Sequence, residues 1–166
     1  MLLPFAAACQ CLHLQPCTFQ HFALRRACSS FMAVDYVALA REYGRLSNLH
    51  DLSGIFRMIN DDAVIYGNEG RAAIVEGMRA FRRRYKDVYW VFHSFELVGP
   101  RQVEFAFDRY WRADSGDGAA VMVCSAAEVI TFTEDGLMQR IDYSRRPTDP
   151  QPSAGYPEGA QVTPTD

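Results

Sequence analysis

The fold is decided by two stretches of sequence, QVEFAFDRYWR at residues 102–112 and AAVMVCSAAEVITFT at residues 119–133. Apolar and polar residues alternate in both stretches, which is the period of a strand with one buried face. A short segment rich in Asp and Gly joins them. Strands joined so tightly must pair antiparallel, because a parallel crossover needs about a dozen residues or more. The two stretches therefore predict an antiparallel hairpin.

The apolar residues of this hairpin also predict its register. With Trp111 opposite Met122 and Phe105 opposite Glu128, both apolar rows share one face, and a slip by one residue would turn them to solvent. That face then holds Val103, Phe105, Phe107, Arg109 and Trp111 from the first strand and Met122, Cys124, Ala126, Glu128, Ile130 and Phe132 from the second. Its two charged members need an explanation, since a buried charge must be paired, hydrogen-bonded or neutral.

Two further strands are predicted at residues 88–98 and 137–145, and the second follows the favoured hairpin turn Asp135-Gly136. A two-residue turn places Tyr143 opposite Glu128, whereas a one-residue bulge would place Asp142 there. The tight connections predict a curved antiparallel meander.

Upstream of the sheet the apolar period is helical. The spacing predicts a first helix from Asp35 to about residue 47 and a third over residues 71–86. Asn48 and Asp51 form a capping-box-like start for a second helix that runs to about residue 59, and a short strand is predicted at 63–66. The fold class is therefore α+β, with three N-terminal helices packed on a curved antiparallel sheet.

Composition divides the 166 residues into three segments. Residues 1–31 contain no Asp or Glu and hold four of the five cysteines, so they indicate a transit peptide or a non-native start ahead of Met32. The spacing of these cysteines does not fit paired zinc ligands. Residues 32–146 form the expected functional domain, and the Pro-rich residues 147–166 are expected to be a disordered tail.

Overall composition narrows the class of protein. The chain is 49% hydrophobic and has 17 basic and 20 acidic residues, so a packed core is expected and a nucleic-acid partner is not. No apolar stretch reaches the roughly 18 residues of a membrane span. We expect a soluble, cytoplasmic protein, or a mitochondrial or plastid one if residues 1–31 are a transit peptide. Motifs for phosphate loops or metal sites are lacking, so no cofactor or metal is expected.

The strand at residues 88–98 predicts a partner. Large apolar side chains are expected on both faces of this strand. Val88, Trp90 and Phe92 lie on one face and Tyr89, Val91 and Phe95 on the other. An antiparallel sheet usually leaves one face wet, so a second copy is expected to cover the open face. The protein is therefore expected to be a homodimer.

This arrangement resembles the NTF2-like superfamily, and within it the SnoaL-like, polyketide-cyclase-like group. The likeness rests on HDL at residues 50–52, NDDAVIY at 60–66, GRAAI at 70–74 and VITFTEDGLM at 129–138. The resemblance implies a cone-shaped fold with an internal pocket. Members include ketosteroid isomerases, dehydratases, cyclases and non-catalytic binding proteins, so the fold alone does not select an activity.

Glu128 is the first candidate for catalysis, because hydrophobic neighbours raise the pKa of a carboxyl group toward neutrality, as a general base or acid requires. Tyr143 could donate to a developing oxyanion, Asp142 could serve as the base, and His93 is a further candidate. The expected substrate pocket is formed by Tyr66, Trp90, Phe105, Phe107, Arg109 and Trp111.

The sequence thus predicts binding of a small apolar or aromatic molecule, with cofactor-independent acid/base catalysis of the isomerase, cyclase, dehydratase or hydrolase type. The alternative is a non-catalytic ligand-binding or protein-interaction module in which the same polar residues are structural.

Overall fold

A computed structural model of the protein describes residues 33–85, 87–113 and 120–162. The helices in this part of the chain are α1 (Tyr36–Asn48), α2 (Leu52–Met58) and α3 (Arg71–Arg84). The strands are β1 (Ile59–Ile65), β2 (Asn68–Glu69), β3 (Tyr89–Gly99), β4 (Gln102–Arg112), β5 (Val121–Phe132), β6 (Met138–Arg145) and β7 (Gln151–Ser153). The cysteine-rich segment expected at residues 1–31 lies outside the described residues, as does most of the β4–β5 connection.

Side-chain caps start the first two helices. Asp35 caps α1 as the sequence indicates, whereas Asp51 alone caps α2, because Asn48 is the last residue of α1. The Asp35 carboxylate accepts a hydrogen bond from the Ala38 N–H at 2.9 Å, and the Asp51 carboxylate accepts one from the Gly54 N–H at 2.7 Å. The predicted end of the second helix is also corrected. Ile59, which we expected to belong to that helix, begins β1 and is buried there. The strand is therefore longer than residues 63–66, with Asp61 and Asp62 exposed along it.

The sheet runs in the order β2-β1-β6-β5-β4-β3, with β7 paired to β5. Pairing from β3 to β6 is antiparallel as expected, but β1 pairs parallel with β6. The sheet is therefore mixed, which corrects the prediction of a wholly antiparallel sheet. The long stretch of chain between β1 and β6 includes α3 and the meander, and it allows this parallel connection.

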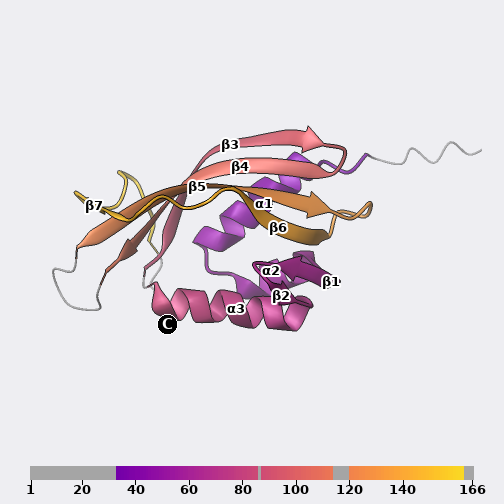
Figure 1. The fold of residues 1–166 in the computed structure, drawn as a ribbon, viewed down its shortest axis with the longest axis horizontal. Coiled ribbons are helices and arrows are strands. Elements are labelled where there is room, and N and C mark those ends of the chain that lie inside the picture. Colours follow the sequence, from indigo (N-terminus) through magenta and orange to yellow (C-terminus); the bar gives the residue numbers. More distant parts are fainter. Residues whose placement is uncertain (1–32, 86, 114–119, 163–166) are drawn as a thin grey trace, which may run out of the picture. The chain divides into compact units, whose positions relative to one another are not determined.

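The register predicted for the central hairpin is confirmed. Phe105 faces Glu128 and Trp111 faces Met122. Phe105 is 1% exposed and Glu128 is 4% exposed, so the charged residue lies in the core-facing row. Helices α1 to α3 lie on one side of the strands β3 to β6 (Figure 1). Helix α1 approaches β3 closely at Gly44, where an added Cβ would lie 3.0 Å from the Phe92 ring.

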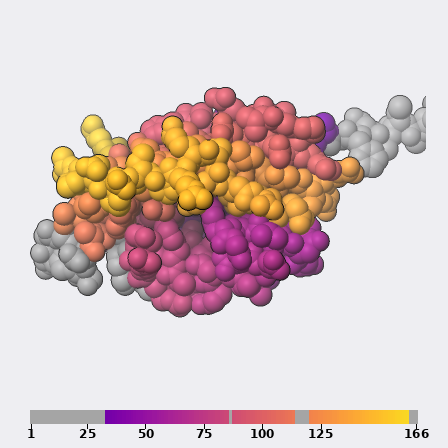
Figure 2. All heavy atoms as spheres, viewed as in Figure 1, coloured from indigo at the N-terminus to yellow at the C-terminus, as the bar shows by residue number. Residues whose placement is uncertain are grey.

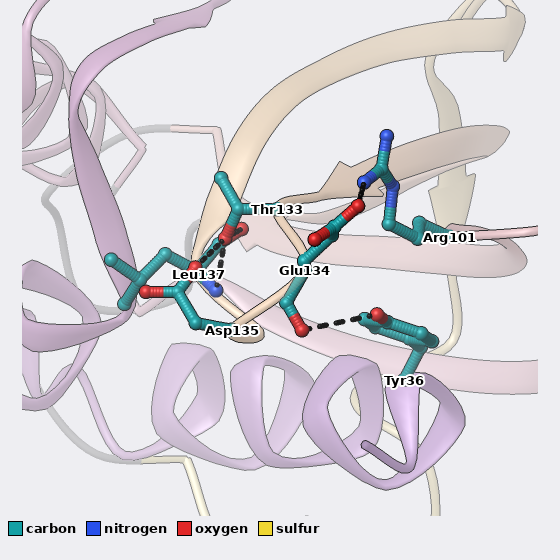
Figure 3. A network of polar contacts seen from close by, with 6 residues as sticks. All are labelled: Tyr36, Arg101, Thr133, Glu134, Asp135 and Leu137. Carbon is teal, nitrogen blue, oxygen red and sulfur yellow. Dashed lines mark hydrogen bonds and ion pairs between the residues drawn. The ribbon is translucent and has the colours of Figure 1, made fainter. Parts of the chain in front are cut away.

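The turn between β5 and β6 sets which residue meets Glu128. The Leu137 N–H donates to the Thr133 hydroxyl at 2.9 Å, and the Tyr36 hydroxyl donates to the Glu134 carbonyl at 3.4 Å (Figure 3). A register irregularity lies next to this turn, at Phe132. Beyond it the pairing is that of a two-residue turn, so Tyr143 lies opposite Glu128 and Asp142 lies opposite Val129.

A β-bulge in β3 changes the faces expected for that strand. The register shifts between Phe92 and Ser94, so the residues on either side of the bulge no longer alternate as the sequence suggests. Phe95 consequently packs against Phe92 and Phe105, with ring centroids 5.4 and 5.7 Å apart, instead of facing outward. The outward face of β3 is less aromatic than we expected, which removes part of the basis for predicting a homodimer.

The C-terminal segment also differs from the expectation of disorder, as far as residues 147–162 are concerned. Strand β7 pairs antiparallel with the start of β5, from Val121 to Val123. The Tyr156 hydroxyl donates to the Asp87 carbonyl at 2.8 Å, and its ring lies 6.5 Å from that of Tyr110. Proline is tolerated because β7 lies at an edge of the sheet, where a backbone N–H can remain unpaired.

Candidate functional site

A cavity of about 260 Å³ lies between the helices and the inner face of the sheet. The surface is hollowed between the pink atoms of α3, the purple atoms of the chain around α2 and β1, and the gold atoms near β6 (Figure 2). Most of the lining is apolar, and its largest apolar side chains are Met78, Phe81, Trp90, Phe92, Phe105 and Phe107. Such a cavity suits a small, largely apolar molecule.

Glu128 is the acidic residue among the described residues that line the cavity. Its Oε2 atom accepts a hydrogen bond from the Tyr66 hydroxyl at 2.7 Å. Tyr66 is the hydrogen-bond donor to this carboxylate within the described part of the chain, so Oε1 has no protein donor there. One oxygen is thus held in place while the other remains available to a ligand.

Burial raises the pKa of Glu128 to about 7, and the hydrogen bond from Tyr66 and the positive charge of Arg109 act in the opposite direction. At neutral pH the carboxyl group is therefore present in both protonation states. A group in this condition can accept a proton and return it.

Tyr66 stands at the end of β1 in a left-handed backbone conformation, with φ of 51°. Residues other than glycine rarely adopt this region, and such conformations concentrate at functional sites. Tyr66 is 44% exposed, and its hydroxyl donates to the buried Glu128 carboxylate. Tyr66 also contacts the Tyr143 ring, with centroids 5.6 Å apart, so two tyrosines border the hollow.

Further hydroxyl groups surround the carboxylate. Burial, followed by the charge of Glu128, raises the pKa values of Tyr43 and Tyr143, and it raises that of Tyr66 in the same way. These phenols therefore keep their protons at neutral pH and can act as hydrogen-bond donors. The hydroxyl of Tyr43 interacts with those of Tyr66 and Ser47, which links α1 to the site.

Two arginines also line the cavity. Arg109 lies over the rings of Phe81, Tyr85 and Trp111, with its Cζ atom 5.1, 5.2 and 5.2 Å from their centroids. Arg82 of α3 is 7% exposed, and it donates to Nδ1 of His50 and to the Met78 carbonyl, both at 3.2 Å. The desolvation of Arg82 lowers its pKa.

The structure brings together most of the residues that we predicted for the pocket. Tyr66, Trp90, Phe105, Phe107 and Arg109 line the cavity together with Glu128 and Tyr143. Trp111 does not line it, because this residue packs in a second cluster with Val88 and Cys124.

Two catalytic candidates are corrected. His93 is exposed at the β-bulge of β3, and its Nε2 lies 2.9 Å from Oδ2 of Asp108 on the other face of the sheet. Asp142 is exposed and paired with Arg140. Both lie away from the cavity. His93 follows the inward-facing Phe92 and shares the outer face with Asp108, and the observed register gives the inner position to Tyr143 instead of Asp142.

The sequence reasoning missed Tyr43, Ser47, Asn68 and Arg82, which also line the cavity. Tyr43 lies in the first predicted helix, and Ser47 follows it at the spacing of one turn. Arg82 is one of three consecutive arginines, and such a run usually indicates a solvated surface. Helical rotation separates them, so that Arg82 is buried while Arg83 and Arg84 are exposed.

No group of three or more His, Cys, Asp or Glu residues in the described part of the chain is arranged to hold a metal ion. Among the helices that the structure describes, none is long and apolar enough to cross a membrane.

Comparisons with known proteins give structural matches. No family model matches the chain, and no curated protein matches its sequence. One similar structure is a Mycobacterium tuberculosis protein in complex with estradiol-17β-hemisuccinate, with a TM-score of 0.56 and 13% identity, covering 67% of this chain and 93% of that one.

Two enzymes match to a similar extent. An epoxide hydrolase/cyclase-like enzyme of pyran ring formation in the polyether salinomycin has a TM-score of 0.56 and 21% identity, covering 66% of this chain and 90% of its own. The Δ5-3-ketosteroid isomerase from a Mycobacterium species has a TM-score of 0.54 and 14% identity, covering 68% and 95%. The described part of this chain therefore shares the fold of these three proteins, in agreement with the fold that the sequence resemblance implies.

Proposed function

We propose that this protein binds a small, largely apolar or aromatic molecule in its cavity and that Glu128 transfers a proton to or from that molecule without a cofactor. Isomerase, cyclase, dehydratase and hydrolase reactions all use such a step. The observation that carries the proposal is a buried carboxyl group with a pKa of about 7 at the wall of a cavity of about 260 Å³.

The ligand-binding part is supported by the apolar lining and by the structural neighbours. Aromatic and aliphatic side chains from α3, β3 and β4 surround the space, and a ligand gains affinity by removing apolar surface from water. One neighbour is seen in complex with a steroid derivative and another is a ketosteroid isomerase. The family resemblance implies a cone-shaped fold, and a ligand would enter the interior of that cone.

The catalytic part is supported by the surroundings of Glu128. In its ionised state, Oε1 would accept a proton from an acidic C–H or O–H of the ligand, while Oε2 keeps its hydrogen bond from Tyr66. Negative charge then develops on the ligand. Tyr143, opposite Glu128 in the sheet, would donate a hydrogen bond to that charge. The low exposure of Glu128 limits competition from water.

The test follows proton transfer directly. The full chain is mixed with 2-tetralone in D₂O, and exchange at the carbon between the ring and the carbonyl is followed by NMR. We expect the wild type to accelerate exchange and Glu128→Gln to lose about 10²- to 10⁴-fold of that rate. Glu104→Gln is the matched control, because Glu104 lies on β4 but outside the cavity lining.

If 2-tetralone binds but exchanges at the same rate with the wild type and Glu128→Gln, the catalytic part is wrong and the protein is a ligand-binding module. If neither 2-tetralone nor estradiol produces a thermal shift or a change in tryptophan fluorescence, the binding part is wrong as well.

A further inference from the structure

The charges of the cavity do not balance. The charged residues among the described lining are Arg82, Arg109 and Glu128. The ion pairs of the described residues involve neither arginine. Because two arginines face one glutamate, the lining carries a net positive charge whether Glu128 is ionised or protonated.

Arg109 has unused hydrogen-bonding capacity. Its Nε is buried and has no acceptor among the described residues. The three aromatic rings around the guanidinium group hold it in place without accepting conventional hydrogen bonds. Arg109 also makes side-chain hydrogen bonds with the Tyr143 hydroxyl and the Cys124 thiol, which leave its Nε without an acceptor in the described part of the chain. Arg82 differs at this atom, because its Nε already donates to His50.

A neutral ligand would aggravate this imbalance. It would displace the water that solvates the two guanidinium groups and would leave buried charges without compensation, which is costly. An anion would supply the missing charge. A carboxylate suits the planar guanidinium group best, because two parallel N–H donors can meet its two oxygens.

We propose that the ligand of this cavity carries a carboxylate, which binds the guanidinium group of Arg109 while its apolar body fills the aromatic part of the cavity. This inference rests on the proposed binding function and narrows its ligand class. The carboxylate and the proton-transfer site then lie at neighbouring positions, since the charge of Arg109 acts on Glu128.

Binding of the carboxylate has a consequence for Glu128. The groups that act on or surround this residue are Tyr43 of α1, Tyr66 at the end of β1, Arg82 of α3, Arg109 of β4 and Tyr143 of β6. Of these, the positive charge of Arg109 favours the ionised form of Glu128. A bound carboxylate would cancel that charge and raise the pKa of Glu128 further. Binding near neutral pH would therefore take up a proton.

The test uses 2-naphthoate and 2-naphthamide, which share an apolar body and differ in charge. Calorimetry on the full chain at pH 7 should show that 2-naphthoate binds about 10- to 100-fold more tightly than 2-naphthamide. Arg109→Met should reduce this preference to less than about threefold, and Arg109→Lys should retain part of it. Arg79→Met is the matched control, since it removes an exposed arginine that pairs with Glu76 on the surface.

Proton uptake provides a second readout that does not depend on the folding of the Arg109 variants. Calorimetry in buffers of different ionisation enthalpy should show proton uptake with naphthoate in the wild type, and Glu128→Gln should abolish it. Equal affinity for naphthoate and naphthamide in the wild type overturns the carboxylate inference but leaves the proposed binding function intact. Failure of both compounds to bind contradicts the inference and the binding function together.

Discussion

Glu128 and Asp108 lie on the paired strands β5 and β4, and each contacts one titratable side chain, yet their surroundings differ. Glu128 faces the helices and accepts a hydrogen bond from Tyr66 inside a largely apolar cavity. Asp108 faces the other side of the sheet, where it accepts a hydrogen bond from Ser125 and meets the exposed His93. The face of the sheet to which a carboxyl group points therefore decides whether it can become reactive, more than the number of its polar partners does.

The largest expected difference between the two faces is in stability. Phe105 is almost fully buried among Tyr43, Phe92 and Phe107. We expect Phe105→Ala to lower the free energy of unfolding by about 3–5 kcal/mol, measured by urea denaturation. Tyr110→Ala, on the opposite face of the same strand, should lower it by less than about 1.5 kcal/mol. Equal losses would contradict a core confined to the helix-facing side.

The next difference concerns pH. The folded protein holds the Glu128 proton up to about pH 7, whereas the unfolded chain releases it near its ordinary pKa of 4.5. The folded state therefore binds more protons between these values, and this contribution to stability is lost as the pH rises from 4.5 to 7. The loss should reach about 2–3 kcal/mol and should be absent from Glu128→Gln.

The unfolding free energies of the wild type and of Glu128→Gln are measured by urea denaturation at several pH values between 4.5 and 7. If the unfolding free energies of Glu128→Gln and of the wild type change with pH in parallel between pH 4.5 and 7, burial does not destabilise the ionised form of Glu128.

A smaller effect is expected from Tyr66→Phe, which removes the hydroxyl but keeps the ring. The hydrogen bond from Tyr66 favours the ionised carboxylate, so its loss should raise the pKa of Glu128 by about one unit. Titration of the Glu128 side-chain carbon by NMR would measure this shift. An unchanged or lower pKa would mean that Tyr66 does not stabilise the ionised form, and Tyr36→Phe, away from the cavity, serves as the control.

The smallest effect on stability is expected on the outer face, where we predicted a second copy to bind. Val91→Glu should change the unfolding free energy by less than about 1 kcal/mol. If the face is a dimer interface, the same substitution should convert a dimer into a monomer in sedimentation experiments on the full chain. A wild-type chain that sediments as a monomer at micromolar concentration contradicts the predicted homodimer.

The sequence predicted what short-range patterns determine. Alternation located the four long strands, and the pairing of Phe105 with Glu128 followed from keeping two apolar rows on one face. It also placed Glu128 among apolar neighbours, as the structure does. The choice between Tyr143 and Asp142 stayed open, because it depends on contacts at the turn that include Tyr36 from the distant helix α1.

What the sequence could not predict arises from long-range contacts or from single-residue irregularities. The bulge at His93 inverts the parity of β3 without any glycine to indicate it. The parallel pairing of β1 with β6 joins segments far apart in the chain. Burial of Arg82 depends on where α3 packs, and its two arginine neighbours look identical in the sequence.

The short strand β7 has a consequence for how this protein should be handled. Ending the chain at residue 146 would leave Val121, Met122 and Val123 with bare backbone donors and acceptors on that side. An exposed strand edge can pair with strands of other molecules, so the shortened chain should aggregate on storage or heating more readily than the full chain. An affinity tag should therefore be fused after residue 162 and should not replace residues 147–162.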